Sequence, residues 1–152
     1  MIKLSIELVP KSCWFSNVRS NVSKAVWDRI RFACYEKAGY KCEICGGKGE
    51  GHRVECHEIW EYDDEHRIQT LLRFIALCPE CHQVKHFGLA QIKGYDGEAL
   101  LHLMKVNEWA KKVADAYVKK AFEIYEERSR HKWELKIGIA GLDINMFGNN
   151  RK

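Results

Sequence analysis

The stretch Leu77-Cys-Pro-Glu-Cys-His-Gln-Val-Lys-His86 decides how this chain is expected to fold. It contains one Cys-x-x-Cys pair, and a second pair lies upstream in the sequence. The four cysteines of the two pairs are Cys42, Cys45, Cys78 and Cys81. Two close thiolate pairs, joined by a closing loop of chain, form a typical ligand set for a tetrahedral structural zinc. The sequence therefore predicts a structural Zn²⁺ held by these four cysteines.

The sequence leaves two other roles open for the paired cysteines. A redox Cys-x-x-Cys needs only one pair, and a disulfide framework needs an oxidising compartment. Cys13, Cys34 and Cys56 lie outside the pairs, and this odd number fits buried free thiols better than disulfides. The first residues alternate apolar and charged side chains, unlike a signal peptide or membrane anchor. We expect a cytoplasmic protein with reduced thiols and no membrane partner.

Length and composition limit the architecture. With 152 residues, 46% of them hydrophobic, the chain can bury one core of ordinary size. No Gly/Ser/Pro-rich linker divides it, so a single domain spanning residues 1–152 is expected. The formal net charge of +4 permits a polyanionic partner. Charge alone does not identify DNA, because nucleic-acid modules are usually more basic.

Periodicity predicts an α+β fold. In the first half it predicts strands over 2–9, 53–60 and 72–77, a helix over about 24–38 with Ser23 as N-cap, and a helix from Pro79 to about Phe87, broken by Gly88. In the second half it predicts a helical extension over about 96–131, made of helices at 98–106 and from an Asn107 cap to about 131. A last strand over 133–139 is expected to pair with the first strand, joining the two termini.

Three histidines are candidates for a second metal centre. His57 ends the first central strand, and His82 and His86 are neighbours on one helix face at spacing i,i+4. Neutral imidazoles bind divalent ions, and a centre with open positions could stabilise charge on a phosphate. Glu58, beside His57, could act as the base for water or complete the coordination. His52, His66, His102 and His131 have no second ligand at useful spacing, so surface or packing roles are expected.

These motifs together resemble a known family. The run Cys42-x-x-Cys45, then Val54-Glu-Cys-His-Glu-Ile59, then Leu77-Cys-Pro-Glu-Cys-His-Gln-Val-Lys-His86 is similar to the HNH endonucleases, which have a zinc-stabilised ββα-metal fold. The resemblance covers about residues 40–87. The preceding helix at 24–38, which ends near Tyr40, also resembles the element before the motif in such nucleases.

The resemblance implies roles for individual residues. Aligned through Ile59, His57 takes a metal position, Glu58 takes the position of the catalytic base, and His82 matches the helical metal ligand. His86 matches an additional helical histidine that some members use. Shifting the alignment by one residue makes His57 the base and leaves Cys56 or Glu55 near the metal. The catalytic residues expected from the resemblance are therefore Glu58, His57 and His82, and the expected catalytic ion is Mg²⁺ or another divalent metal.

The chain also departs from the family pattern. The family has histidine where this chain has Glu58, and a carboxylate is a weaker base than imidazole unless burial raises its pKa. The family's orienting asparagine is replaced, with Arg73 at the nearest position. His82 could instead support the zinc thiolates, and His86 could be a surface residue. Lys85, Arg73 and Arg53 are the expected contacts to nucleic acid.

Two functions follow as expectations. The first is a metal-dependent DNA endonuclease or nickase that hydrolyses phosphodiester bonds. The second is a zinc-stabilised nucleic-acid-binding or adaptor module in which cleavage is weak or lost. The sequence leaves open whether the protein is a monomer or a homodimer.

Overall fold

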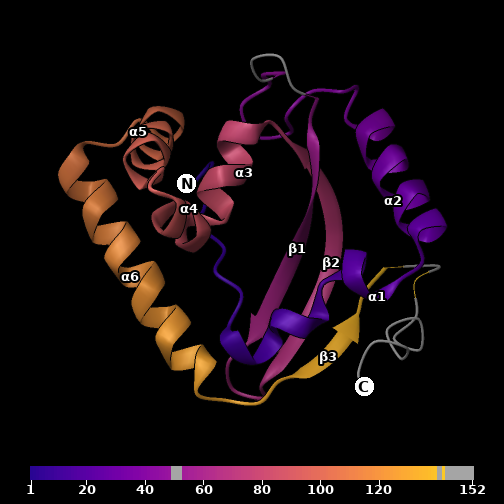
Figure 1. The fold of residues 1–152 in the computed structure, drawn as a ribbon. Helices are drawn as coiled ribbons and strands as arrows, with labels where there is room; N and C mark the ends of the chain where they lie inside the picture. The colour runs from indigo at the N-terminus through magenta and orange to yellow at the C-terminus, as the bar shows by residue number, and fades with distance from the viewer. Residues whose placement is uncertain (49–52, 140–141, 143–152) are drawn as a thin grey trace.

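The structure, a computed structural model, describes residues 1–48, 53–139 and 142. About half of the chain is helical, and a small three-stranded sheet lies among the helices (Figure 1). The strands are β1 (Glu55–Asp63), β2 (Ile68–Leu77) and β3 (Glu134–Ile137). The prediction of an α+β fold is therefore confirmed, and both central strands extend further towards their connecting turn than the sequence predicted.

The central hairpin aligns the site residues. β1 and β2 are antiparallel, with Glu55 opposite Leu77 and His57 opposite Ile75, and a bulge follows Ile59. Side chains of opposed residues lie on the same face of the sheet, and neighbours along a strand alternate between faces. Glu55, His57 and Ile59 thus share one face of β1.

The predicted pairing of the two termini is wrong. β3 lies parallel to β2, giving the sheet order β1-β2-β3, and residues 2–9 form no strand. The alternation in residues 2–9 reflects burial only, with Leu4 and Ile6 pointing into the core. Backbone groups of this segment bind helical residues instead: the amides of Lys3 and Leu4 donate to the Asn107 side chain.

The helices lie on both sides of the hairpin. The 3₁₀ helix η1 (Lys11–Ser16), α1 (Val18–Asn21) and α2 (Lys24–Lys37) precede it in the chain. Figure 1 shows α2 on one side of β1 and β2, and the later helices on the other. The predicted N-cap is confirmed, because the Ser23 hydroxyl accepts a hydrogen bond from the Val26 amide.

The later helices follow β2 directly. They are α3 (Pro79–Lys85), α4 (Phe87–Lys93), α5 (Asp96–Asn107) and α6 (Lys111–Ser129). The expected break at Gly88 occurs instead at His86, and Gly88 lies inside α4. Asn107 ends α5 and binds the N-terminal segment, so it does not cap α6. None of the helices in the described ranges is long and apolar enough to cross a membrane.

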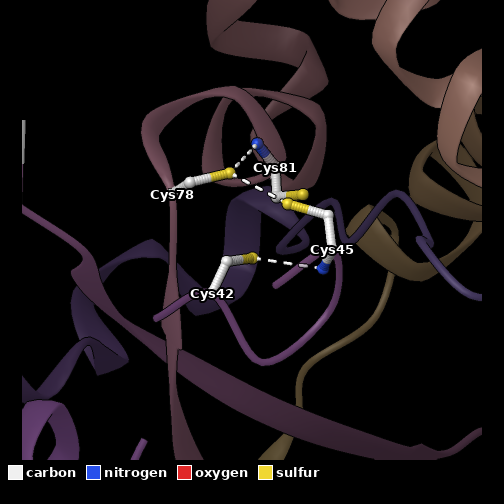
Figure 2. Close-up of side chains that lie close together, drawn as sticks. All are labelled: Cys42, Cys45, Cys78 and Cys81. Atoms are coloured by element: carbon white, nitrogen blue, oxygen red, sulfur yellow. Dashed lines mark hydrogen bonds between the residues drawn. The ribbon is translucent and has the colours of Figure 1, made fainter. Parts of the chain in front are cut away.

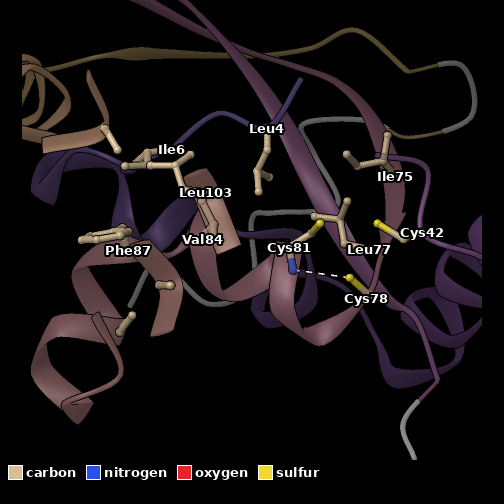
Figure 3. Close-up of a cluster of buried hydrophobic side chains, with 13 residues drawn as sticks. Leu4, Ile6, Cys42, Ile75, Leu77, Cys78, Cys81, Val84, Phe87 and Leu103 are labelled. Carbon is tan, nitrogen blue, oxygen red and sulfur yellow. Dashed lines mark hydrogen bonds between the residues drawn. The ribbon is translucent and has the colours of Figure 1, made fainter. Parts of the chain in front are cut away.

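The largest core lies between the sheet and helices α3 to α6. Its buried members include Leu4, Leu77, Val84, Phe87 and Leu103 (Figure 3). Three cysteines of the Cys-x-x-Cys pairs are part of the same cluster. A second cluster, around Val18, Leu71 and Leu135, packs with Trp60 and Trp27. Three of the four paired cysteines are thus part of the main core, and Cys45 is exposed.

Candidate functional site

The four paired cysteines form one cluster. Their sulfur atoms all lie within 4.8 Å of one another, and the Sγ atoms of Cys45 and Cys78 are 3.6 Å apart (Figure 2). Cys78 is the N-cap of α3, and its Sγ accepts a hydrogen bond from the Cys81 amide at 3.4 Å. The amide of Cys45 makes the same contact with Cys42 at 3.5 Å. Four converging thiols with donors turned towards their sulfurs could hold a metal ion.

The local sequence explains this geometry. Pro79 at the first position of α3 fixes the backbone for the helix start without losing a needed amide donor. In the first pair, Gly46 adopts a positive φ of 76°, which turns the chain back beside the cysteines. The neighbouring Cys81 thiol and nearby backbone amides lower the pKa of Cys42. A thiolate, the form that binds metals, is therefore favoured at Cys42.

His102 was missed by the sequence reasoning. It lies on α5, and its Nε2 atom is 3.2 Å from the Sγ of Cys81. This contact with the cysteine cluster was not expected from the sequence, and His82, the proposed alternative partner of the thiolates, lies in the histidine cluster instead. No pattern in the sequence could reveal this contact, because α5 reaches the cluster only through tertiary packing.

His57, His82 and His86 form a second cluster. One ligand nitrogen from each lies within 4.8 Å of the others, and the Nε2 atoms of His82 and His86 are 3.1 Å apart. The ring centroids are separated by 4.7 to 5.2 Å. His57 comes from the face of β1 that packs towards α3, and the other two come from α3 and its C-terminal end. This set could hold a divalent ion.

Two carboxylates flank the histidine cluster. The Oε2 atom of Glu7 lies 2.7 Å from Nε2 of His57, and Glu55 contacts Nδ1 of His82. A carboxylate on one ring nitrogen fixes the tautomer and directs the other nitrogen outward. Glu55 was identified from the shifted alignment, but Glu7 was not, since it lies far away in the sequence. Nε2 of His82 is thereby directed towards His86.

Electrostatics favour neutral imidazoles in the cluster. Burial lowers the pKa of His57, against the opposing effect of Glu7. Burial, together with the neighbouring His82 and His57, lowers the pKa of His86 to about 4. Burial raises the pKa of Glu7, but the hydrogen bond with His57 and the charge of Lys85 outweigh it, and the net shift is downward. The lowered pKa values favour uncharged His57 and His86 beside an ionised Glu7 at neutral pH.

Glu58 is not brought to the histidine cluster. As the neighbour of His57 on β1 it points to the opposite face, where its two oxygens accept hydrogen bonds from the Val18 amide and the Trp60 indole, each at 3.0 Å. Burial raises its pKa to about 7. One oxygen therefore attaches α1 to the strand and the other binds a side chain of β1 itself, so Glu58 is not placed to act as a base beside His57.

The three expected contacts to nucleic acid have different environments. Lys85 has a side chain only 4% exposed and donates to Glu7 and Ser5, both at 2.8 Å. A buried ammonium with two partners cannot reach a phosphate, so Lys85 does not fit that expectation. Arg53 and Arg73 are exposed. Arg73 lies opposite Ile59 and so shares the sheet face of His57.

The remaining cysteines and histidines are less informative. Cys13, Cys34 and Cys56 are free thiols, with Cys34 and Cys56 hydrogen-bonded to each other between α2 and β1. His66 binds Asp63 and His131 binds Glu127, both local partners near the surface. His52 lies outside the described residues. Within the described part of the chain, none of the other positions belongs to a further ligand set.

The histidine cluster borders a large cavity. This cavity has a volume of about 1180 Å³ and is lined by the N-terminal segment, β1, α4 and α6. His57, His82 and His86 all line it, together with the exposed apolar residues Leu89 and Ile92. The cluster is thus accessible to a ligand although His57 itself is only 5% exposed.

Comparisons with protein-family models, with curated proteins and with solved structures found no match to this chain. The site must therefore be interpreted from its own geometry.

Proposed function

We propose that this protein is a metal-dependent endonuclease or nickase of the HNH type that hydrolyses phosphodiester bonds in DNA. The observation that carries the proposal is the convergence of His57, His82 and His86 from a strand and the helix after its partner strand. The four-cysteine cluster lies at the start of the same short helix, α3, whose N-cap is Cys78. Two strands and a helix that present a candidate metal site beside a cluster of four cysteines support the proposal.

Zinc is the proposed ion of the cysteine cluster. Sulfurs about 2.3 Å from a tetrahedral zinc are roughly 3.8 Å apart. The 3.6 Å between Cys45 and Cys78 is close to this value. The cluster supplies four thiols and leaves no open position, as structural zinc sites do. Its role would be to hold the Cys42 loop against α3.

The catalytic ion is assigned to His82 and His86. Two nitrogen ligands at about 2.1 Å from one ion lie roughly 2.9 to 3.4 Å apart, depending on the angle. Their Nε2 atoms are separated by 3.1 Å. A divalent ion held there would supply stabilisation of the negative charge that develops on the attacked phosphate.

His57 is the proposed base, in place of Glu58. Its contact with Glu7 is of the kind that orients an imidazole and stabilises it once it accepts a proton. This assignment corresponds to the alignment shifted by one residue, with Glu55 supporting His82. His57 would take a proton from the attacking water at its second ring nitrogen, while Glu7 stays ionised.

One observation favours a second function. Glu58 occupies the family's base position but is engaged with Val18 and Trp60, and Arg73 replaces the orienting asparagine. A nucleic-acid-binding or adaptor module that has lost efficient cleavage would tolerate both changes. This alternative predicts binding without turnover.

A plasmid assay tests the two functions. Purified protein is incubated with supercoiled plasmid and Mg²⁺, Mn²⁺ or Ni²⁺, with EDTA as the metal-free control, beside variants His82→Ala, His57→Ala and Glu58→Gln. The endonuclease proposal expects nicked or linear product that requires metal, His82 and His57, and is retained in Glu58→Gln. Folded, metal-loaded protein that binds DNA and leaves the plasmid intact with every metal would favour the binding module.

A further inference from the structure

We propose that Glu7 is a positioning residue of the histidine cluster, fixing the ring of His57 so that Nδ1 is the free nitrogen. Because it assigns a role within the proposed active site, this inference rests on the proposed function. With Glu7 included, the proposed active site extends beyond residues 40–87 and contains part of the N-terminal segment.

The contacts of Glu7 form a continuous chain. Its Oε2 lies 2.7 Å from Nε2 of His57, and its Oε1 accepts a hydrogen bond from Nζ of Lys85 at 2.8 Å. Lys85 also donates to the Ser5 hydroxyl at 2.8 Å. The backbone joins the same two elements, since the amide of Glu7 donates to the carbonyl oxygen of Lys85 at 3.1 Å. Glu7 is therefore held at both its backbone and its carboxylate.

The chemistry of the contact decides the tautomer of His57. An ionised carboxylate only accepts hydrogen bonds, so the proton of a neutral imidazole must be on the nitrogen facing it. Nζ of Lys85, whose side chain is 4% exposed, donates to Oε1 of Glu7 at 2.8 Å, and a contact of this kind favours the ionised form of the carboxylate. Nε2 of His57 then carries the proton, and Nδ1 keeps its lone pair.

The helical extension holds the segment that carries Glu7. The amides of Lys3 and Leu4 donate to Oδ1 of Asn107 on α5, at 2.8 and 3.1 Å. The amide of Ile6 donates to the Tyr117 hydroxyl on α6 at 3.0 Å. An extended segment without strand partners is thus fixed immediately before Glu7. Helices α5 and α6 thus hold in place the segment that carries Glu7.

A purely structural role for the ion pair would give a different result. If Glu7 served only to bind Lys85 and close the N-terminal segment, its replacement would alter stability and leave the ring nitrogens of His57 unchanged. A positioning role changes the ring itself. Glutamine is the informative substitution, because its amide can donate to Nε2 and so favour the opposite tautomer.

The experiment compares wild-type protein with Glu7→Gln by long-range ¹H–¹⁵N NMR of the His57 ring, in protein loaded with zinc but without other metal. We expect the Nε2-protonated pattern in the wild type and its loss in Glu7→Gln. Glu108→Gln is the matched control, since Glu108 contacts Lys3 of the same segment from an exposed position and should leave the ring unchanged. Unchanged His57 nitrogen shifts in folded Glu7→Gln would overturn the proposal.

A second variant covers the case in which Glu7→Gln does not fold, because it leaves Lys85 buried without a counter-charge. The double variant Glu7→Leu with Lys85→Met removes both charges and the acceptor that faces Nε2 of His57, and loss of the exclusive Nε2-protonated pattern is expected. Cleavage is measured separately, with a fall in kcat of roughly 10-fold or more expected in either variant. A tautomer change in a protein that never cleaves would refute the nuclease and support the role of Glu7, so the two failures are distinguishable.

Discussion

Nε2 of His102 lies 3.2 Å from Sγ of Cys81, so helix α5 contacts the four-cysteine cluster directly. A ring N–H donated to a ligand thiolate offsets part of its charge and fixes its direction. We expect His102→Phe to lower the affinity of the cluster for its ion by roughly 10- to 100-fold, as loss of such outer partners commonly does. Chelator competition measures the affinity, with His131→Phe as control, because the His131 ring binds the exposed residue Glu127. Equal affinities in both variants would exclude a role for His102.

Removing the proposed zinc ion from the cysteine cluster should destabilise the whole protein. Cys42, Cys78 and Cys81 belong to the main core, so four thiols without an ion would leave that core poorly packed. A strong chelator, or Cys81→Ser, is expected to lower Tm by roughly 10 °C or more, since structural metal sites contribute folding energy directly. Differential scanning calorimetry with metal analysis checks this. Cys13→Ala, a buried cysteine outside the cluster, should keep the full metal content.

The burial of Glu58 predicts a pH-dependent stability. Its pKa is raised to about 7 in the folded protein, so between the unfolded pKa and 7 the folded state binds more protons than the unfolded state. The contribution of the Glu58 carboxyl to the free energy of unfolding is therefore complete below the pKa of the unfolded state and is lost as pH rises through 7. Relative to Glu58→Gln, the free energy of unfolding should fall by up to roughly 3 kcal/mol between pH 5 and pH 8. Urea unfolding at both pH values measures it, and a constant difference would contradict the burial of this carboxyl.

Arg53 and Arg73 should contribute to nucleic-acid affinity through charge. Both are exposed, and Arg73 shares a sheet face with His57. Each replacement by alanine should weaken binding similarly for all sequences and reduce the salt slope by about 1. Fluorescence anisotropy at several salt concentrations checks this. Lys24→Ala, at an exposed lysine paired with Asp28, is the control. Slopes that match the control would remove both arginines from the interface.

Gly138 tests the unexpected position of β3, and Gly97 in α5 serves as the comparison. A Cβ on Gly138, just after β3, would lie 3.0 Å from the carbonyl oxygen of Leu71 in β2. Gly138→Ala should therefore destabilise the protein by about 1 to 2 kcal/mol. Gly97 in α5 has open space around its Cβ position, so Gly97→Ala should stabilise by roughly 0.5 to 1 kcal/mol through helix propensity. Chemical denaturation compares the two, and a neutral Gly138→Ala would argue against the close parallel approach of β3.

Local patterns in the sequence were enough to predict much of this protein. The cysteine pairs, the i,i+4 histidines and the Ser23 cap depend on residues within one or two turns, where backbone geometry fixes the distances. The composition of residues 53–60 and of the apolar run 72–77 likewise indicated the two central strands, the first of which carries His57. These elements lie close to where the sequence predicted them.

Tertiary packing alone decided the rest. Glu7 and His102 reach the two clusters across long stretches of chain, and β3 pairs with β2, not with the N-terminal segment. The alternation in residues 2–9 could not separate a strand from an extended segment bound to helices, because burial has the same period in both. Glu58 is adjacent to His57 in sequence and yet faces away from it. The sequence by itself determined which cysteines and histidines are present and how each local pair is spaced. Only the assembled fold decided that Glu7 supports His57 and that His102 contacts Cys81. These partners depend on long-range contacts, which no local pattern in the sequence encodes.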